Sequence, residues 1–324
     1  MIVRWGLDEL EPLLSELGMS RPMLVTSKRF GDLDLPVATR FSGVRRHAPV
    51  ETVSAAVAAA RDSDGLVGVG GGSAIDTGKA VSAELGIPLV AVPTTYAGAE
   101  WTPYFGMRDQ ARKLKTGGSG ADTLAVVYEP ELTLGLPREE TVGTAMNALT
   151  HSAEALYVDG RNADGDVEAV AGAGLIARWL PETVARPDDL EARTGLLRGA
   201  MHAGKALGLT GLALAHALAQ ALGGRYGLPH GAMNALTLPP TLRFNEPVVP
   251  DAVERFGRAL DSDDAAMRVA ELAGLGGFER LRDFGVPVEE LPLVAAEAAA
   301  RPGALANPRT VSPDDAFSLL RGIW

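Results

Sequence analysis

The chain has 324 residues, of which 46% are hydrophobic, and a formal net charge of −11. This length predicts two domains with separate cores, and no apolar run reaches membrane-spanning length. The acidic balance argues against nucleic-acid binding, which needs clustered Lys and Arg, and the absence of Cys excludes disulfides and thiolate chemistry.

Residues 1–136 alternate short apolar runs with helical stretches, which predicts an α/β domain with a mostly parallel sheet. We expect strands at 22–26, 65–69, 87–92 and 123–127, and helices at 7–17, 50–61 and about 74–85. Residues 137–324 show almost no strand-like alternation and predict an all-α domain. Its expected helices are 138–158, 164–180, 190–222, 230–244, 250–260, 263–274 and 288–300, with Pro and Gly breaks at 181–187, 223–229 and 246–250.

A glycine-rich loop lies between an expected strand and an expected helix. Glycines let the backbone approach a phosphate closely, and the following helix N-terminus offers free N–H groups. Three consecutive glycines and a Ser at the helix start favour phosphate binding over a structural turn, while Asp76 can support the loop or touch the ligand. The residues expected to bind the phosphates are Gly70, Gly71, Gly72 and Ser73.

Two more loops at strand ends are candidates for the same ligand. The loop after the strand at 22–26 begins with Ser27 and offers no carboxylate to hold an adenosine ribose or repel a 2′-phosphate. Ser27 would therefore tolerate NADP as well as NAD, or it is an exposed turn residue. The loop after the strand at 87–92 places Thr94, Thr95 and Tyr96 for contact with a ligand in the crevice.

Four of the five His residues fall within 80 residues of the expected all-α domain. Asn147 and His151 are four residues apart, as are His216 and Gln220, so each pair shares one helical face. His230 stands at the start of a further expected helix. One such pair is usually a satisfied buried pair, but two pairs plus a helix-start His suggest convergence on one catalytic cleft.

Five segments in this order resemble the iron-containing alcohol dehydrogenases, and among them most resemble the maleylacetate reductases. The segments are Gly-Gly-Gly-Ser-Ala-Ile-Asp-Thr-Gly-Lys (70–79), Pro-Thr-Thr-Tyr-Ala-Gly-Ala-Glu (93–100), Glu-Pro-Glu-Leu-Thr-Leu-Gly-Leu-Pro (129–137), Asn147–His151 with Glu-Ala-Leu-Tyr (154–157), and Leu-Gly-Gly-Arg-Tyr-Gly-Leu-Pro-His (222–230). The resemblance covers roughly residues 6–245. It implies an NAD(P)-binding α/β domain over 1–136, a helical catalytic domain over 137–324 of the dehydroquinate synthase-like fold, and a cofactor contact from Lys115.

The resemblance also implies where a metal would lie. The family's Asp, His, His and His ligands fall on Asn147, His151, His216 and His230, so the only anionic ligand is replaced by an amide, as is common in maleylacetate reductases. Gln220 stands where the family usually has a second His near the nicotinamide. Three imidazoles, His151, His216 and His230, can still hold Zn or Fe with a water, but we favour a site without metal.

The reaction implied by the resemblance is NAD(P)H reduction of the enone double bond of maleylacetate to 3-oxoadipate, in the degradation of aromatic compounds. Hydride addition would place negative charge on the ketone oxygen, which hydrogen-bond donors or a metal must stabilise, and a His would supply the proton. Two substrate carboxylates require cationic or polar partners. The candidates, each of which could instead be a surface group, are Tyr96, Arg225, Arg243, Lys205 and His202.

Three other functions stay open at this point. A metal-dependent alcohol or polyol dehydrogenase of the same fold is disfavoured by Asn147 and Gln220, and a non-redox lyase resembling dehydroquinate synthase by the single lysine, Lys205, of the helical half. A binding protein that has lost activity is the third. The first residues do not resemble a signal peptide, so we expect a cytoplasmic homodimer that acts on a small molecule and binds neither nucleic acid nor membrane.

Overall fold

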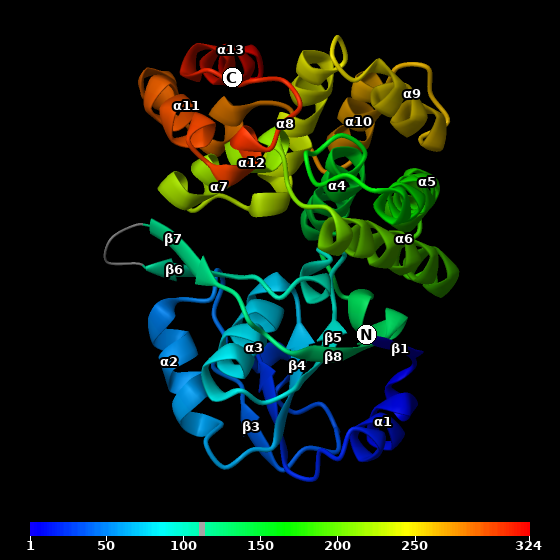
Figure 1. The fold of residues 1–324 in the computed structure, drawn as a ribbon. Coiled ribbons are helices and arrows are strands. Elements are labelled where there is room, and N and C mark those ends of the chain that lie inside the picture. The colour runs from blue at the N-terminus through cyan, green and yellow to red at the C-terminus, as the bar shows by residue number, and fades with distance from the viewer. Residues whose placement is uncertain (110–113) are drawn as a thin grey trace. The chain divides into compact units, whose positions relative to one another are not determined.

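A computed structural model shows two compact units, Met1–Thr133 and Leu134–Trp324 (Figure 1). It describes residues 1–109 and 114–324, and the side chains of residues 114 and 115 also lie outside the described part. Each unit has its own core. The first is an α/β unit and the second is helical, which confirms the fold class expected from the sequence.

The first unit is built on a sheet of six parallel strands in the order β1-β8-β5-β4-β2-β3. Its strands are β1 (Ile2–Trp5), β2 (Pro22–Thr26), β3 (Thr39–Phe41), β4 (Gly65–Gly70), β5 (Leu89–Pro93) and β8 (Thr123–Tyr128). The chain runs from β2 outward to β3 and then returns to β4 on the other side of β2. In open parallel sheets such a reversal leaves a ligand crevice outside the carboxyl ends of the two strands, here β2 and β4.

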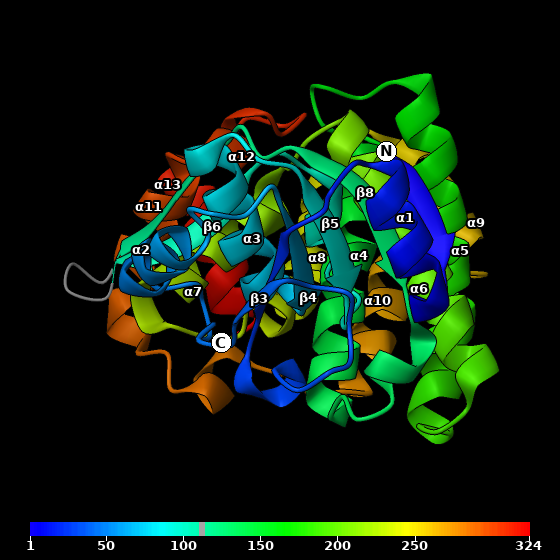
Figure 2. The same cartoon turned by 90° about the horizontal axis from the view of Figure 1, so that it is seen from below.

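The strands alternate their side chains between the two faces of this sheet. Leu24 of β2 packs with Leu10 of α1 (Leu10–Glu16) on one face. Its neighbours Met23 and Val25 pack on the other face with residues of α2 (Val50–Ala59) and α3 (Gly72–Leu85). Figure 2 shows α1 on one side of the strands and α2 and α3 on the other. This double cover buries all five residues of β2.

The expected strands and helices of this unit are all present, with ends that differ by a few residues. Four strands were not expected. β1 and β3 are short and lie at the two edges of the sheet, and their residues are at best partly buried. β6 (Phe105–Asp109) and β7 (Leu114–Gly118) form a separate antiparallel hairpin. Short 3-10 turns lie at Leu7–Glu9, Lys28–Phe30, Ala99–Trp101 and Pro130–Thr133.

The second unit contains helices throughout its described length. They are α4 (Arg138–Ala155), α5 (Ala163–Ala185), α6 (Leu190–Leu209), α7 (Leu214–Tyr226), α8 (His230–Asn245), α9 (Pro250–Ala259), α10 (Ala265–Gly274), α11 (Leu291–Ala299), α12 (Pro302–Leu305) and α13 (Pro313–Gly322), with 3-10 turns at Leu281–Phe284 and Val288–Glu290. Within the described residues, no single helix has the length and apolar character to cross a membrane, although α6 and α7 meet those criteria as a bent pair.

Three expected helix ends of this unit are wrong. The segment 190–222 is two helices, α6 and α7, bent by 100° at a break that contains Gly211 with φ of 133°. α5 continues through Pro181 to Ala185, where the loss of one N–H near the helix end is tolerated. α7 passes Gly223 and Gly224 and stops at Gly227, which adopts the left-handed conformation typical of a helix C-terminus.

Helices α4 and α8 approach each other closely through two glycines. A Cβ added to Gly231 at the start of α8 would lie 2.1 Å from the carbonyl oxygen of Gly143 on α4. Real Cβ atoms do not approach a backbone oxygen so closely, so any side chain here would force the two helices apart. Because Asn147 lies one turn after Gly143, this approach also sets the spacing of the polar residues described below.

We therefore expect Gly231→Ala to destabilise the helical unit by about 1–3 kcal/mol, the usual effect of overpacking a core. The measurement is the midpoint of urea unfolding. Gly274→Ala is the matched control, because nothing lies within 4 Å of a Cβ at that helical glycine, and it should be neutral or stabilising by up to about 1 kcal/mol. Equal losses in the two variants would contradict the close approach.

Candidate functional site

The glycine loop follows β4 at the carboxyl edge of the parallel sheet. Gly70 has φ of 144°, which favours glycine, and a Cβ there would lie 2.7 Å from the Cβ of Ala74. A Cβ on Gly71 would lie 2.8 Å from the side-chain methyl of Thr95. The packing of the loop itself therefore requires the first two glycines.

The packing of the loop does not require a glycine at the third position, Gly72. No atom lies within 4 Å of a Cβ built on Gly72, which is the first residue of α3 and has an ordinary backbone conformation. The absence of a side chain here keeps open the space in front of the helix N-terminus, where free N–H groups and the helix dipole favour a phosphate. This open space is where the loop fits a dinucleotide.

The other predicted cofactor residues of this unit share the same edge of the sheet. Ser27 directly follows β2, whose last residue, Thr26, pairs with Val69 of β4. Thr94 and Thr95 follow β5, and the Thr94 N–H donates to the Gly70 carbonyl oxygen at 3.0 Å. Tyr96 is fully buried, whereas Ser27 and Thr95 are partly exposed.

Two of the predicted residues are engaged by the protein. The Ser73 hydroxyl accepts a hydrogen bond from the His47 N–H at 2.9 Å. Asp76 accepts from the Gly106 N–H at 3.1 Å and forms an ion pair of 3.2 Å with the buried Lys79. Of its two expected roles, the contacts of Asp76 support the structural one. The backbone of Lys115 lies in β7, but its side chain lies outside the described residues.

In the helical unit, the structure brings the three predicted His rings together. The rings of His151 on α4 and His216 on α7 stack with centroids 4.7 Å apart and an interplanar angle of 10°. The ring of His230, the first residue of α8, lies 5.7 Å from that of His216. Three helices thus contribute one imidazole each to a common cluster, which we call the histidine cluster.

Two side-chain amides link the members of the histidine cluster. The Asn147 Oδ1 lies 3.3 Å from His216 Nε2 and accepts a hydrogen bond of 2.6 Å from Asn234 Nδ2. The same Asn234 Nδ2 lies 3.2 Å from His230 Nε2. Asn234 was not predicted from the sequence, although it lies four residues after His230, the same spacing that singled out Asn147 and His151.

His151 is buried, and its Nδ1 has no hydrogen-bond partner within the described residues. Burial and the neighbouring His216 ring hold the pKa of His151 well below its ordinary value. Desolvation disfavours the charged form of an imidazole, so His151 is neutral near pH 7. A neutral imidazole with an uncommitted nitrogen can donate or accept one hydrogen bond.

A fourth buried group, Glu154, was quoted in a motif but not predicted as a site residue. It lies on α4, is fully buried, and accepts a hydrogen bond from His216 Nδ1 at 2.7 Å. Glu154 and His151 are three residues apart, so the helical spacing already placed them on neighbouring positions of one face. The sequence signal for Glu154 was this spacing from His151, but the apolar residues around Glu154 made it hard to recognise.

The remaining predicted residues are not joined to the histidine cluster by any hydrogen bond described. Gln220 is partly exposed, and its side chain makes no hydrogen bond within the described part of the chain. His202 bonds to Glu168 at 2.5 Å, with Lys205 3.9 Å from the same carboxylate. These contacts occupy the groups that were expected to bind substrate.

The two predicted arginines are also paired with carboxylates. Arg225 at the end of α7 contacts Glu290 at 2.8 Å and Glu297 at 3.2 Å. Arg243 pairs with Asp264 and lies 13 residues after His230 on α8, which separates their backbones by roughly 20 Å at the rise of a helix. The structure therefore places Arg243 away from the histidine cluster.

The histidine cluster does not fit a metal ion as it is arranged. Across the described residues, no group of three or more His, Asp or Glu side chains is placed to hold one. His216 Nε2 and His230 Nε2, two nitrogens that would bind a metal, lie instead against the amides of Asn147 and Asn234. The amide at position 147 also supplies no negative charge to a divalent cation.

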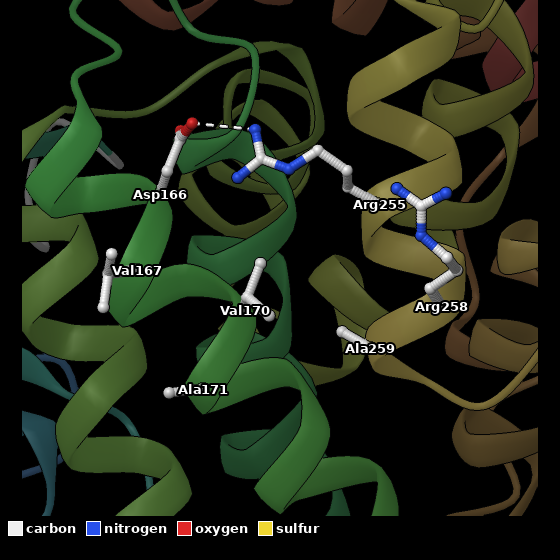
Figure 3. Close-up of a pocket in the computed structure, with 7 residues that line it drawn as sticks. All are labelled: Asp166, Val167, Val170, Ala171, Arg255, Arg258 and Ala259. Carbon is white, nitrogen blue, oxygen red and sulfur yellow. Dashed lines mark hydrogen bonds and ion pairs between the residues drawn. The ribbon is translucent and has the colours of Figure 1, made fainter.

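A shallow hollow lies elsewhere in the helical unit, between α5 and α9 (Figure 3). It is lined by Asp166, Val167, Val170, Ala171, Arg255, Arg258 and Ala259. Arg255 pairs with Asp166 at 2.8 Å and Arg258 pairs with Glu254, so its charges are already balanced. None of the predicted site residues lines this hollow.

A parallel α/β unit with a glycine loop, followed by a helical unit with a buried histidine cluster, defines a nucleotide-dependent dehydrogenase class. The chain belongs to the iron-containing alcohol dehydrogenase family: the family's model for iron-containing alcohol dehydrogenase matches residues 3–128, and the model for its C-terminal part matches residues 141–324. This membership confirms the prediction that the protein is an NAD(P)-dependent oxidoreductase.

Among its relatives, the chain is similar to several maleylacetate reductases. It is 38% identical to that of Sphingobium indicum over 95% of this chain and 90% of the relative, and 34% identical to maleylacetate reductase 1 of Rhodococcus opacus over 96% and 90%. The crystal structure of maleylacetate reductase from Rhizobium sp. strain MTP-10005 is 33% identical, with a TM-score of 0.91 over 100% of this chain and 95% of that one.

Gly72 provides a direct test of the cofactor loop. We expect Gly72→Val to fold normally, because nothing lies within 4 Å of a Cβ at this position, yet to weaken NADPH binding roughly 10- to 100-fold. The side chain would displace one hydrogen bond to a charged phosphate, worth about 1.5–3 kcal/mol. Fluorescence titration gives the Kd. Gly322→Val, at another open helical glycine, is the control, and equal Kd values in all three proteins would remove the loop from the cofactor site.

Proposed function

We propose that this protein reduces the carbon–carbon double bond of maleylacetate to 3-oxoadipate with NADH or NADPH. The proposal is supported by the similarity to maleylacetate reductases over nearly the whole chain. The structural observation that carries it is the amide network of Asn147 and Asn234, which occupies the histidine cluster where an alcohol dehydrogenase needs a metal ligand.

The chemistry of this substrate suits a site without metal. NAD(P)H transfers a hydride to the carbon β to the ketone, the double bond shifts, and negative charge forms on the ketone oxygen. A proton then adds to the α carbon, so that one NAD(P)H and one proton are consumed for each 3-oxoadipate formed. No alkoxide has to be generated first, and hydrogen-bond donors in a water-poor site can stabilise the enolate.

The described residues divide this work between them. His151 is neutral, buried and has an uncommitted nitrogen, which suits a hydrogen bond to the developing enolate oxygen. His216 and His230 are the candidates to deliver the proton. The glycine loop of the first unit would bind the cofactor phosphates, with Thr94, Thr95 and Tyr96 near the nicotinamide and Lys115 as a further contact.

Cofactor choice is part of the same proposal. Ser27 follows β2 at the point where many dinucleotide-binding folds carry a carboxylate for the adenosine ribose, so we propose that both NADPH and NADH are accepted. We further propose that the protein acts in the cytoplasm as a homodimer, and that residues 1–136 and 137–324 are its cofactor-binding and catalytic domains.

Ser27→Asp tests the cofactor proposal. The new carboxylate should raise the Kd of NADPH by about tenfold or more, because it would repel the 2′-phosphate, and leave the Kd of NADH nearly unchanged. The matched control is Ser54→Asp, which adds the same charge on the exposed face of α2. Equal losses for both cofactors would show that residue 27 does not lie at the ribose.

The reaction itself is tested by the consumption of NADH and NADPH with maleylacetate, with simple alcohols and without substrate, before and after chelator treatment. We expect consumption with maleylacetate only, unchanged by the chelator. His151→Ala, His216→Ala and His230→Ala should each lower kcat roughly 10²–10⁴-fold and preserve cofactor binding. Alcohol oxidation that depends on added Fe or Zn would instead establish metal-dependent dehydrogenase chemistry.

A further inference from the structure

The side chain of Glu154 on α4 joins the start of α7 to a ring of the histidine cluster. Its Oε2 accepts hydrogen bonds from the Ala213 N–H at 2.7 Å and from His216 Nδ1 at 2.7 Å, and its Oε1 accepts from the His216 N–H at 3.1 Å. Glu154 is fully buried. A buried carboxylate is tolerated only when donors surround it, and here α7 supplies all three.

Glu154 has a second role besides capping the N-terminus of α7. Ala213 is the N-cap of α7 and offers no side-chain hydrogen bond of its own. The cap comes instead from a residue 59 positions earlier in the chain. Glu154 contacts both the backbone and the ring of His216, so the same carboxylate fixes where the helix begins and how this imidazole is turned.

The hydrogen-bond roles determine the state of the His216 ring. A carboxylate that already accepts two backbone N–H groups accepts a third from the ring, so Nδ1 carries a hydrogen. The other nitrogen, Nε2, lies 3.3 Å from Asn147 Oδ1 inside the histidine cluster, and it donates to this oxygen only when Nε2 also carries a hydrogen. In many enzymes a carboxylate holds a functional His in one tautomer and one orientation in this way.

An ordinary capping carboxylate elsewhere in the unit shows the difference. Asp189 caps α6 through the N–H groups of Glu191 at 3.0 Å and Ala192 at 3.1 Å. It contacts no imidazole and its side chain is about a quarter exposed, at 24%. Asp189 therefore stabilises a helix without orienting a reactive group, and it provides a matched control for Glu154.

We propose that Glu154 is a positioning residue that holds His216 with Nδ1 protonated and Nε2 turned into the histidine cluster, where it faces Asn147 Oδ1. The expected effect on turnover rests on the proposed reductase function. The expected orientation and tautomer of the His216 ring do not. The assignment predicts that removing the charge of Glu154 changes the state of one ring, not merely the stability of the unit.

The first test is an NMR measurement that needs no substrate. Protein labelled with ¹⁵N at histidine gives ring correlations that distinguish Nδ1–H from Nε2–H, and with five His in the chain single His→Gln variants assign them. We expect His216 in the native protein to be protonated at Nδ1, and Glu154→Gln to shift this ring to the other tautomer or to a mixture. Asp189→Asn should leave the His216 signals unchanged.

The second test is turnover of maleylacetate by the folded protein. Glu154→Gln should lower kcat roughly 10- to 10³-fold with little change in the KM for NADPH, and Glu154→Asp, which keeps the charge, should recover part of the rate. Asp189→Asn keeps an oxygen that can cap α6 but removes the charge paired with Arg186, so it should lower the Tm by at most a few °C and leave kcat within about twofold of native.

Several results would overturn the assignment. One is a native His216 protonated at Nε2 alone, which is measurable even if every Glu154 variant fails to fold. Another is Glu154→Gln with a native His216 spectrum and native kcat. If the native protein shows Nδ1 protonation but does not reduce maleylacetate, the proposed function fails while the hold of Glu154 on the ring stands.

Discussion

A carboxylate deep inside a protein requires hydrogen-bond donors, and in the helical unit the placement of those donors determines the local architecture. Glu154 is fully buried, and the first turn of α7 supplies its partners. Burial, together with this charge, raises the pKa of the Tyr157 hydroxyl, which lies just past the end of α4. The break between α6 and α7, the direction of α7 and the orientation of His216 are thus all tied to one charged group.

The candidate sites of the two units differ in the kind of interaction that they offer to a ligand. In the first, the backbone N–H groups at the N-terminus of α3 lie beside a glycine with no neighbour within 4 Å of its Cβ position, an arrangement that suits an anion. In the second, imidazoles and amides lie largely buried, where each hydrogen bond is strong and an unpaired polar group is costly. The first arrangement therefore favours a ligand with negative charge, and the second holds a few polar atoms in fixed positions.

Local patterns predicted this protein well wherever a segment's structure depends on its own residues. β2 was expected at Pro22–Thr26 and lies there, because its apolar run is buried on both faces of the sheet. The glycine loop and the two i,i+4 pairs were visible for the same reason. The edge strands β1 and β3 were missed because short, half-exposed segments carry little apolar signal.

Long-range interactions account for the rest. The segment 190–222 reads as one helix, and the carboxylate that caps the start of α7 lies on α4, far away in the sequence. Likewise, Arg225, Arg243, Lys205 and His202 looked available for substrate, but acidic partners from distant helices engage each of them. A residue's partner is a property of the folded chain, so composition and spacing could not reveal it.

The contact between Gly143 and Gly231 has a consequence for how such a site can change over evolutionary time. The width of the histidine cluster is set by two main chains in contact, not by the bulk of the side chains that line it. Replacements at lining positions can alter polarity and hydrogen bonding while the frame stays the same. New substrates are therefore more readily acquired by changing side chains on this fixed backbone frame than by moving α4 and α8 apart.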